Sequence, residues 1–541
     1  MRERSEMILA DLIRIRAERQ PDLPVLTFEH LSLDGRATPD EVRSYADLDA
    51  NANRIAAGLL ARRLAPGERF AIMMGNHPEF VEAMVAASAS GAVFVPIDPR
   101  TRGEKLLYLL GRSGCRGILC ADYCLFQLDA VRAQLAGLEW VLALETGGDA
   151  PARTSFRGVD SLAEVLAEPA PSLDARVPSP DAPLQIMYTS GTTGDPKGIV
   201  GSNARFCAAG VLGALFAYGE DERPYTGLSL THGNAQSVTL APALTRGLRA
   251  VLSRRFTKSR LWDVCRAYGC TSFSLVGGMA MGIYSEPPRP DDADNPVRRV
   301  VSGGMPAAIW EPFEKRFAVK ILEFYGAMDG GGMAYKPVGE GPTGSFGKPM
   351  PGLEMKVLDA NGDVCPPGVV GEICTRPAGG DPATLEYFGD PEASARKLRG
   401  GWNHSGDMGH ADADGWLFFD YRAGGGIRHN GEFVNPGFVE KAIAEHPSVR
   451  DVFVYGVPAA SGTPGEKDVV AAIVPVGEGG LDPASIFERC RAELEANFVP
   501  SYVQVVDEIP KTASEKPQER WFVERFDAGA ANVHTRKPGA A

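Results

Sequence analysis

One stretch of the chain, Met187 to Gly198, combines the residue types that bind phosphate groups: Met-Tyr-Thr-Ser-Gly-Thr-Thr-Gly-Asp-Pro-Lys-Gly. Gly191 and Gly194 allow the backbone to turn its N–H groups toward an anion at little steric cost. Lys197 adds a positive charge, and four hydroxyls add further donors: Thr189, Ser190, Thr192 and Thr193. The stretch is therefore a candidate phosphate-binding loop.

The spacing does not fit the loop of ordinary P-loop NTPases. Counted from Gly191, the second glycine of that motif falls on Pro196, and Gly198 stands where a Ser or Thr should follow the lysine. A run of Ser, Thr and Gly is most often a flexible surface loop. The length and residue order of this run favour a specific phosphate site instead.

The segment closely resembles YTSGTTGxPKG, the phosphate-binding signature of the adenylate-forming superfamily. That superfamily comprises acyl-CoA synthetases, the adenylation domains of peptide synthetases, and firefly luciferase. Further segments resemble superfamily motifs in the same order along the chain. The resemblance therefore covers nearly the whole sequence.

Two of these segments imply an adenine and metal site. Val301-Ser-Gly-Gly-Met-Pro306 resembles the turn that borders the adenine, where glycines permit close approach of a flat ring. The residues implied there are Gly303, Gly304 and Met305. Tyr325-Gly-Ala-Met-Asp329 resembles the motif YGxTE, which implies that Tyr325 and Gly326 cover the other adenine face. The same resemblance assigns Mg²⁺ to Asp329 and Thr189.

The next motifs imply the ribose contacts and the catalytic lysine. Ser405-Gly-Asp407 stands where the family has TGD, whose carboxylate accepts hydrogen bonds from both ribose hydroxyls. Arg422 corresponds to an arginine that binds ribose or phosphate oxygens. Pro510-Lys-Thr-Ala-Ser-Glu-Lys516 resembles PxTxxGK, which implies that Lys516 reaches the α-phosphate and the acyl carboxylate during adenylation.

Departures from these motifs bear on the metal and on the lysine loop. Met328 replaces the usual Thr, and Asp329 is one methylene shorter than the usual Glu. We therefore expect the Asp329 carboxylate to reach Mg²⁺ through a water molecule or by a shift of its backbone. Glu515 replaces the Gly before Lys516, which removes a residue that adopts positive φ easily.

The resemblance also implies the sites of the acid and of coenzyme A. His232 ends a segment that resembles the strand beside the substrate carboxylate. Glycines would remove side chains from the walls of the acyl tunnel and leave room for more than acetate. These glycines are Gly277, Gly278 and Gly330. Gly431 lies in a segment that resembles the border of the pantetheine tunnel of coenzyme A. The acyl-CoA ligases of the carnitine/crotonobetaine type resemble the chain most.

Composition limits the class of protein. The chain of 541 residues is 44% hydrophobic and 23% charged, and no apolar run approaches the ~18 residues of a membrane span. A net charge of −13 argues against a nucleic-acid surface. The N-terminus has mixed charges and no apolar signal-peptide block, so we expect a cytoplasmic protein. The nine cysteines show no paired CxxC spacing, which disfavours zinc and disulfides.

Alternating helices and strands position these residues. The periodicity predicts helices over 44–64 and 78–90 and strands over 69–74 and 92–97. Such repeats favour an α/β fold with parallel, doubly wound sheets. The resemblance adds a distorted barrel to this domain.

Gly424-Gly425-Gly426 predicts a hinge, because three consecutive glycines disfavour a helix or strand interior. We therefore expect an N-terminal domain over 1–422, a hinge over 423–427, a small mobile α+β domain over 428–527 and a disordered tail over 528–541. In the small domain we expect helices over 438–445 and 482–497 and strands over 449–457 and 468–476.

The implied function is an AMP-forming acyl-CoA ligase of fatty acid metabolism. A small-molecule carboxylic acid and MgATP give acyl-AMP and pyrophosphate, and coenzyme A then displaces AMP after domain rotation. Two alternatives stay open: an adenylation enzyme that loads a carrier protein or an amine, and a non-catalytic nucleotide-binding sensor. The sequence leaves the acid, the acceptor, the pathway and a homodimer undecided.

Overall fold

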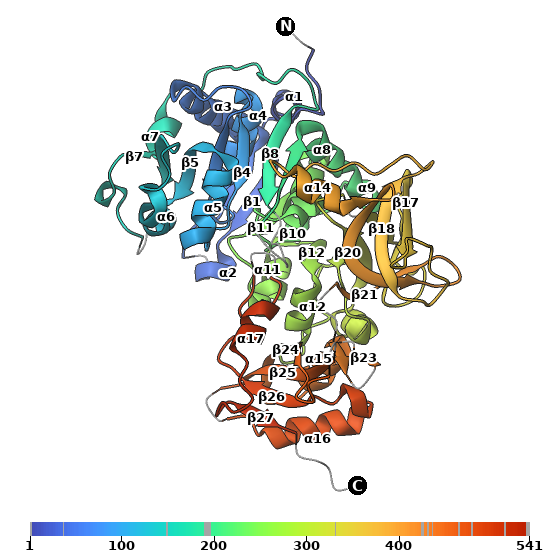
Figure 1. Cartoon of the computed structure of the whole chain (residues 1–541). Helices are drawn as coiled ribbons and strands as arrows, with labels where there is room; N and C mark the ends of the chain where they lie inside the picture. Colours follow the sequence, from blue (N-terminus) through green and yellow to red (C-terminus); the bar gives the residue numbers. More distant parts are fainter. Residues whose placement is uncertain are drawn as a thin grey trace. The chain divides into compact units, whose positions relative to one another are not determined.

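A computed structural model describes residues 3–35, 37–147, 150–188, 196–330, 332–423, 427–429, 432–434, 436–463, 466–477, 480–512 and 515–536. These residues form two compact units. The first unit is Met1–Ser274 with Glu386–Ser394, and the second is Leu275–Leu385 with Ala395–Ala541. Figure 1 shows the first 274 residues in blue to green.

The first unit contains a seven-stranded sheet with the order β7-β6-β5-β3-β4-β8-β9. Its strands are parallel apart from β9, which runs antiparallel to β8. Apolar side chains of α5 and α6 cover the sheet, so its strands read as continuous apolar runs. The strands are β3 (Arg69–Met73), β4 (Val93–Pro96), β5 (Cys115–Ala121), β6 (Trp140–Leu144), β7 (Val159–Ser161), β8 (Pro183–Tyr188) and β9 (Gly198–Ser202).

A further set of five paired strands in this unit has the order β2-β1-β11-β10-β12. All its pairs are parallel except β1 with β2. The strands are β1 (Pro24–Glu29), β2 (Glu41–Ser44), β10 (Pro224–Thr226), β11 (Ala250–Ser253) and β12 (Ser272–Val276), the last of which continues into the second unit.

The helices of the first unit begin and end where local chemistry favours it. Ser44 and Asp47 form a capping box at the start of α3, and α4 starts with Pro78 and stops at Gly91, whose φ is +79°. The helices are α1 (Leu9–Arg19), α2 (Leu31–Asp34), α3 (Tyr45–Ala61), α4 (Pro78–Ser90), α5 (Gly103–Ser113), α6 (Leu125–Arg132), α7 (Leu162–Ala167), α8 (Asn203–Ala208), α9 (Leu212–Leu215), α10 (Ala241–Arg246) and α11 (Leu261–Tyr268).

The second unit begins with eight strands that pair in the order β13-β14-β15-β16-β21-β20-β18-β17, and all these pairs are antiparallel except β13 with β14. Strand β19 (Leu398–Arg399) pairs with β20. The other strands are β13 (Arg299–Gly303), β14 (Lys320–Gly326), β15 (Met333–Lys336), β16 (Ser345–Pro349), β17 (Leu353–Leu358), β18 (Gly371–Pro377), β20 (Trp402–Ala411) and β21 (Leu417–Arg422).

The C-terminal part of this unit is a four-stranded sheet of order β24-β25-β26-β27, together with the hairpin β22-β23. Phe522 of α17 packs on Tyr455 and its neighbours in the sheet core. The strands are β22 (Ile427–His429), β23 (Glu432–Val434), β24 (Val449–Pro458), β25 (Lys467–Pro475), β26 (Tyr502–Val505) and β27 (Val533–Thr535). The helices of the unit are α12 (Gly277–Tyr284), α13 (Trp310–Phe317), α15 (Pro436–Ala444), α16 (Pro483–Glu493) and α17 (Glu519–Arg525), while α14 (Pro391–Lys397) spans the boundary between the units.

The predicted α/β class with a small C-terminal α+β part is confirmed. The prediction of a disordered tail over 528–541 needs a correction, because strand β27 lies in this range and pairs with β26. The domain boundaries stay a prediction, since the hinge residues Gly424–Gly426 lie outside the described residues and the compact units divide elsewhere. Among the described helices, none has the length and apolar character that a membrane crossing requires.

Candidate active site

Most of the predicted phosphate loop lies outside the described residues: Thr189, Ser190, Gly191, Thr192, Thr193 and Gly194, as does the predicted pantetheine residue Gly431. Lys197 is described, immediately before β9. Its ammonium lies 5.4 Å from the ring centroid of Tyr387, which is buried. The Tyr387 backbone forms a bridge with Ile199, and Phe388 N–H donates to the Gly198 carbonyl at 2.8 Å. The Lys197 ammonium therefore makes a cation–π contact with an aromatic ring of its own unit.

The loop that carries His232 is held by a buried asparagine. Asn76 is fully buried, and its amide nitrogen donates to the carbonyls of Leu228 (2.9 Å) and Ser253 (2.8 Å). Its amide oxygen accepts from Leu230 N–H at 2.8 Å. Because all these groups are buried, the three bonds fix the course of the loop.

His232 itself is half-buried. Its Nδ1 accepts from Asn234 N–H at 3.2 Å, which assigns the proton of a neutral ring to Nε2. A substrate role for His232 stays a prediction.

In the second unit, a buried carboxylate supports the predicted adenine turn. Strand β13 ends at Gly303, and Gly304 has φ +112°, which an L side chain rarely adopts. Glu323 on β14 is 3% exposed and accepts hydrogen bonds from the N–H groups of Gly304 and Met305. Burial raises the pKa of Glu323 to about 7, although these hydrogen bonds and Lys336 oppose the shift. The turn thus depends on a carboxylate that titrates near neutral pH.

Predicted adenine and ribose residues meet at the end of the same strand. The Tyr325 hydroxyl donates to Asp407 Oδ2 at 2.6 Å, and its ring stacks on Phe346 with centroids 4.5 Å apart. Burial and the carboxylate raise the pKa of Tyr325, so the phenol stays protonated and donates.

Asp407 is 5% exposed and pairs with Arg422, whose Nη1 lies 2.9 Å from Oδ1. Within the described part of the chain, Oδ1 accepts no hydrogen bond of regular geometry. A buried carboxylate oxygen with remaining acceptor capacity is suited to a ribose hydroxyl.

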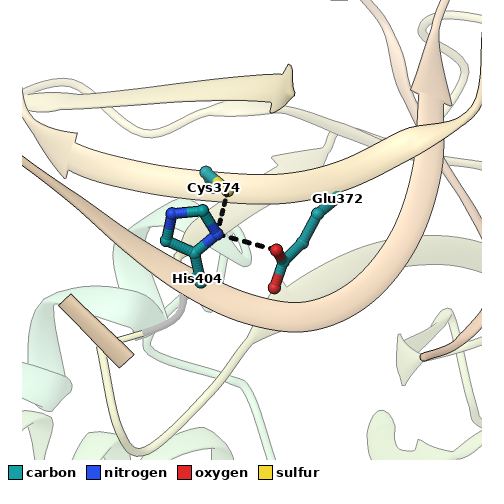
Figure 2. Close-up of side chains that lie close together, drawn as sticks. All are labelled: Glu372, Cys374 and His404. Carbon is teal, nitrogen blue, oxygen red and sulfur yellow. Dashed lines mark hydrogen bonds and ion pairs between the residues drawn. The ribbon is translucent and has the colours of Figure 1, made fainter. Parts of the chain in front are cut away.

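A second carboxylate holds the turn that carries Asp407. Glu372 Oε1 accepts from Gly406 N–H at 3.0 Å, and its Oε2 lies 2.7 Å from His404 Nδ1. Figure 2 shows these side chains with Cys374, whose sulfur is 3.3 Å from the same nitrogen. Glu372 and His404 come from the neighbouring strands β18 and β20. The turn is therefore tied to the sheet by side chains as well as by its backbone.

Glu372, Cys374 and His404 have ligand atoms within 4.8 Å of one another, a grouping that could hold a metal ion. The Arg399 guanidinium already lies 2.9 Å from His404 Nδ1 and 3.3 Å from Glu372 Oε2. Burial also raises the pKa of Cys374 to about 12, so its thiol stays protonated. Because a guanidinium lies against these side chains and the thiol is neutral, the cluster fits a hydrogen-bonded support of the Asp407 turn better than a metal centre.

Lys516 is close enough to Asp407 and Arg422 in this unit for their charges to shift its pKa. It is exposed, yet desolvation by surrounding protein atoms lowers its pKa, Arg422 lowers it further, and Asp407 opposes both. Glu515, where the sequence motif has Gly, adopts φ +56°. The loop is closed by Thr512 N–H, which donates to the Lys516 carbonyl at 2.8 Å. Glu515 therefore keeps the left-handed backbone at a steric cost.

The lysine loop makes a close contact with a predicted acyl-site glycine. A Cβ added to Gly278 would lie 2.8 Å from the Glu515 carbonyl oxygen and 3.1 Å from Pro517 Cδ. A Cβ on Gly277 would lie 3.0 Å from the Gly304 carbonyl. These glycines are required by close backbone approach, which is independent of any acyl tunnel.

Asp329, the predicted metal residue, is 8% exposed and forms an ion pair with Lys397. Asn403 Nδ2 donates to its main-chain carbonyl at 2.9 Å. A carboxylate paired with an ammonium does not fit the direct Mg²⁺ ligand that the motif implies, since Lys397 occupies Oδ2 and would repel the cation. Gly326 and Gly330 are exposed near this turn, and Gly330 has φ +71°.

Four residues that position these groups were not identified from the sequence: Asn76, Glu323, Glu372 and Lys397. Glu323 carried one usable signal, since it is a carboxylate inside the apolar run Ile321-Leu322-Glu323-Phe324. Glu372 likewise stands between Gly371 and Ile373 in a strand. A charge inside a buried strand usually has a fixed partner. Asn76 and Lys397 carried no such signal.

Comparison with known proteins gives a consistent result. The sequence model of the family described as AMP-binding enzyme matches residues 13–380, and that of the AMP-binding enzyme C-terminal domain matches residues 439–516. The medium/long-chain-fatty-acid–CoA ligase FadD17 of Mycobacterium tuberculosis is 31% identical over 490 residues, which cover 89% of this chain and 91% of the relative. The crotonobetaine/carnitine–CoA ligase of Salmonella typhi is 28% identical, over 87% and 91% of the two chains.

Among solved structures, the anthranilate CoA ligase AuaEII in complex with anthranoyl-AMP has a TM-score of 0.80. It is 22% identical, and the match covers 95% of this chain and 96% of that one. This likeness concerns the fold, which extends over nearly the whole length of both chains.

Proposed function

Because the chain belongs to the AMP-binding enzyme family and is an AMP-forming acid–CoA ligase, we propose that it activates an apolar carboxylic acid at the site formed by Tyr325, Asp407, Arg422 and Lys516. The observation that supports this site most is that Asp407 accepts from Tyr325 and pairs with Arg422, while the charges of Asp407 and Arg422 both act on Lys516. The lysine comes from the C-terminal sheet region, about a hundred residues after Asp407, yet the charge of the predicted ribose carboxylate acts on it.

In the first step, a carboxylate oxygen of the acid attacks the α-phosphorus of ATP, and pyrophosphate leaves with the electrons of the broken P–O bond. Asp407 would accept hydrogen bonds from the ribose hydroxyls, and Arg422 would donate to ribose or phosphate oxygens. Lys516 would stabilise the negative charge that develops between the carboxylate and the α-phosphate. Mg²⁺, bound as MgATP, would neutralise phosphate charge.

In the second step, the thiol of coenzyme A attacks the carbonyl carbon of the acyl-AMP, and AMP leaves. A carboxylate becomes a useful target for a thiol only after its oxygen is part of a mixed anhydride. The predicted rotation about Gly424–Gly426, which would bring Gly431 to the site, stays a prediction. So do the phosphate-loop roles of residues 189 to 194.

The acid is proposed to carry an apolar acyl chain of medium or greater length. The segment that resembles the acyl tunnel is apolar, with Met279, Met281 and Ile283 buried in α12. The FadD17 relative acts on medium- and long-chain fatty acids by its name. The crotonobetaine/carnitine relative favours a second candidate, a short polar acid. We further propose a cytoplasmic location, where ATP and coenzyme A are available, and leave a homodimer as a prediction.

A panel of acids tests this proposal. ATP–pyrophosphate exchange should proceed with octanoate or palmitate at least about tenfold faster than with carnitine or acetate, and thioester formation should follow with coenzyme A. Exchange restricted to short polar acids would overturn the substrate class. If exchange occurs but the acyl group is transferred only to a carrier protein or an amine, the protein is an adenylation enzyme of that kind. If no acid supports exchange, the protein is a nucleotide sensor.

Replacing Lys516 by alanine tests the catalytic assignment. Lys516→Ala should lower acyl-AMP formation by ~10²–10³, because a preorganised cation at the developing charge is lost. Thioester formation from supplied acyl-AMP should persist. If both half-reactions fall equally in a folded variant, the assignment of Lys516 to the first step is wrong.

A further inference from the structure

Asp329 and Lys397 form a buried ion pair at the position where the sequence motif implies a metal ligand. The Lys397 ammonium bonds Asp329 Oδ2, and the two side chains are 14% and 11% exposed. Lys397 is the last residue of α14, 68 positions from Asp329 in the sequence. Water therefore screens this pair little, and the charges of the two groups offset each other.

The pair belongs to the same framework as the ribose carboxylate. Asn403, which is 1% exposed, donates to the Asp329 carbonyl, and it lies on β20 four residues before Asp407. Four strand residues span about 13 Å. From β14 onward, the chain supplies Glu323 under the adenine turn, Tyr325 at Asp407, and then Asp329. The ion pair therefore lies on the same stretch of chain as the predicted adenine and ribose residues.

The ammonium retains the capacity to bind phosphate while it is paired. A lysine has three N–H donors, and the bond to Asp329 uses one of them. The carboxylate also restricts a side chain that is otherwise long and mobile, so the cation is positioned before a nucleotide binds. By contrast, a divalent ion on the same carboxylate would lie against this ammonium and be repelled.

We propose that Lys397 is a catalytic residue of acyl-AMP formation that binds the pyrophosphate part of ATP, and that Asp329 is the positioning residue that holds it. In this arrangement Lys397 donates to oxygens of the β- and γ-phosphates while the P–O bond to the α-phosphorus breaks. Its charge stabilises the departing pyrophosphate, and no proton transfer is needed. Mg²⁺ remains with the ATP phosphates and is not bound directly by Asp329. The proposal rests on the placement of the ribose at Asp407.

The test uses the full-length enzyme with Lys397→Met, Lys397→Arg, Asp329→Asn and the double variant Asp329→Asn/Lys397→Met. Lys356→Met is the control, since Lys356 is exposed on β17. Two quantities are measured: the rate of ATP–pyrophosphate exchange, and the affinity of Mn²⁺ for the enzyme–ATP complex by electron paramagnetic resonance. Binding of ATP to Asp407→Ala is measured in parallel.

Lys397→Met should lower exchange by ~10², as expected for loss of a preorganised cation, and Lys397→Arg should recover part of the rate. The double variant should be no slower than Lys397→Met, because Asp329 acts through the lysine. Asp329→Asn should change Mn²⁺ affinity less than about threefold, since the metal is held by phosphates.

A tenfold or greater loss of Mn²⁺ affinity in Asp329→Asn would overturn the proposal and make Asp329 the metal ligand, and tighter Mn²⁺ binding in Lys397→Met would also contradict it. The metal measurement on Asp329→Asn decides this point even if Lys397→Met fails to fold. If Asp407→Ala binds ATP as tightly as the wild type, the ribose placement is wrong and the role of Lys397 falls with it.

Discussion

Replacing Gly278 by alanine should disturb the first half-reaction through the Lys516 loop. The added Cβ would lie 2.8 Å from the Glu515 carbonyl oxygen, whereas ordinary contact begins at 3.4 Å. The opposing atom belongs to the backbone, so the loop must move by about 0.6 Å to restore ordinary contact. Lys516 follows Glu515 directly and moves with it.

A displacement of 1 Å in a catalytic group can cost ~10²-fold in rate. A shift of about 0.6 Å should therefore slow acyl-AMP formation about tenfold, or ~1.4 kcal/mol in the activation barrier. Thioester formation from supplied acyl-AMP should change less than about twofold. Single-turnover measurements of the two half-reactions check this expectation.

Gly111→Ala is the matched control. Gly111 lies in helix α5, where a Cβ would meet only Leu135 Cδ2 at 3.9 Å, and both substitutions gain helix propensity. In a Lys516→Ala background, Gly278→Ala should cost nothing further in acyl-AMP formation. An increased KM for the acid, with both half-reactions lowered equally, would refute the loop mechanism and assign Gly278 to the acyl tunnel.

Two further predictions concern stability. Glu323 has a folded-state pKa of about 7 against an ordinary 4.5, so the folded protein binds this proton more tightly than the unfolded chain does, and the contribution of Glu323 to the free energy of unfolding falls as pH rises from about 4.5 to 7. The stability of Glu323→Gln relative to wild type should therefore rise by about 2–3 kcal/mol between pH 5 and pH 8 in denaturant titrations. A pH-independent difference would contradict this. Asn76→Asp would replace the donating amide nitrogen by an oxygen that faces the carbonyls of Leu228 and Ser253, so the free energy of unfolding should fall by about 3 kcal/mol at pH 8 and by less at pH 4. The control is Asn361→Asp, on an exposed turn. Unchanged hydrogen exchange at Leu230 N–H in Asn76→Asp would exclude the loop-holding role.

Local chemistry is sufficient for many elements of the fold. The predicted helix over 78–90 matches α4, because proline is favoured at the start of a helix and Gly91 readily ends one. The predicted helix over 482–497 is shorter in the structure, where α16 starts after the cap Asp482 and ends at Glu493. Its last residues form a 3-10 turn over Ala496–Phe498 instead. Helix ends without a strong stop signal are poorly specified by the sequence.

Contacts between distant strands could not be predicted in this way. Glu372 reaches His404 because β18 pairs with β20 in one particular register, and that register depends on the whole sheet. The pair of Asp329 and Lys397 likewise depends on where α14 ends. Strand β27 was missed because its residues Val533–Thr535 are ordered by β26, whereas the surrounding Ala- and Gly-rich sequence suggested disorder.

The segment Glu386–Ser394 has a consequence for the order of events during synthesis. It completes the first unit, where Tyr387 pairs with Ile199 and supports Lys197, yet it is made long after Ser274. At 5–20 residues per second, a ribosome needs roughly ten seconds to cover the interval. During that time the unit lacks the residues whose backbone pairs with β9. The first unit is therefore unfinished when it leaves the ribosome, and it can be completed only after strands β13 to β18 of the second unit have been made.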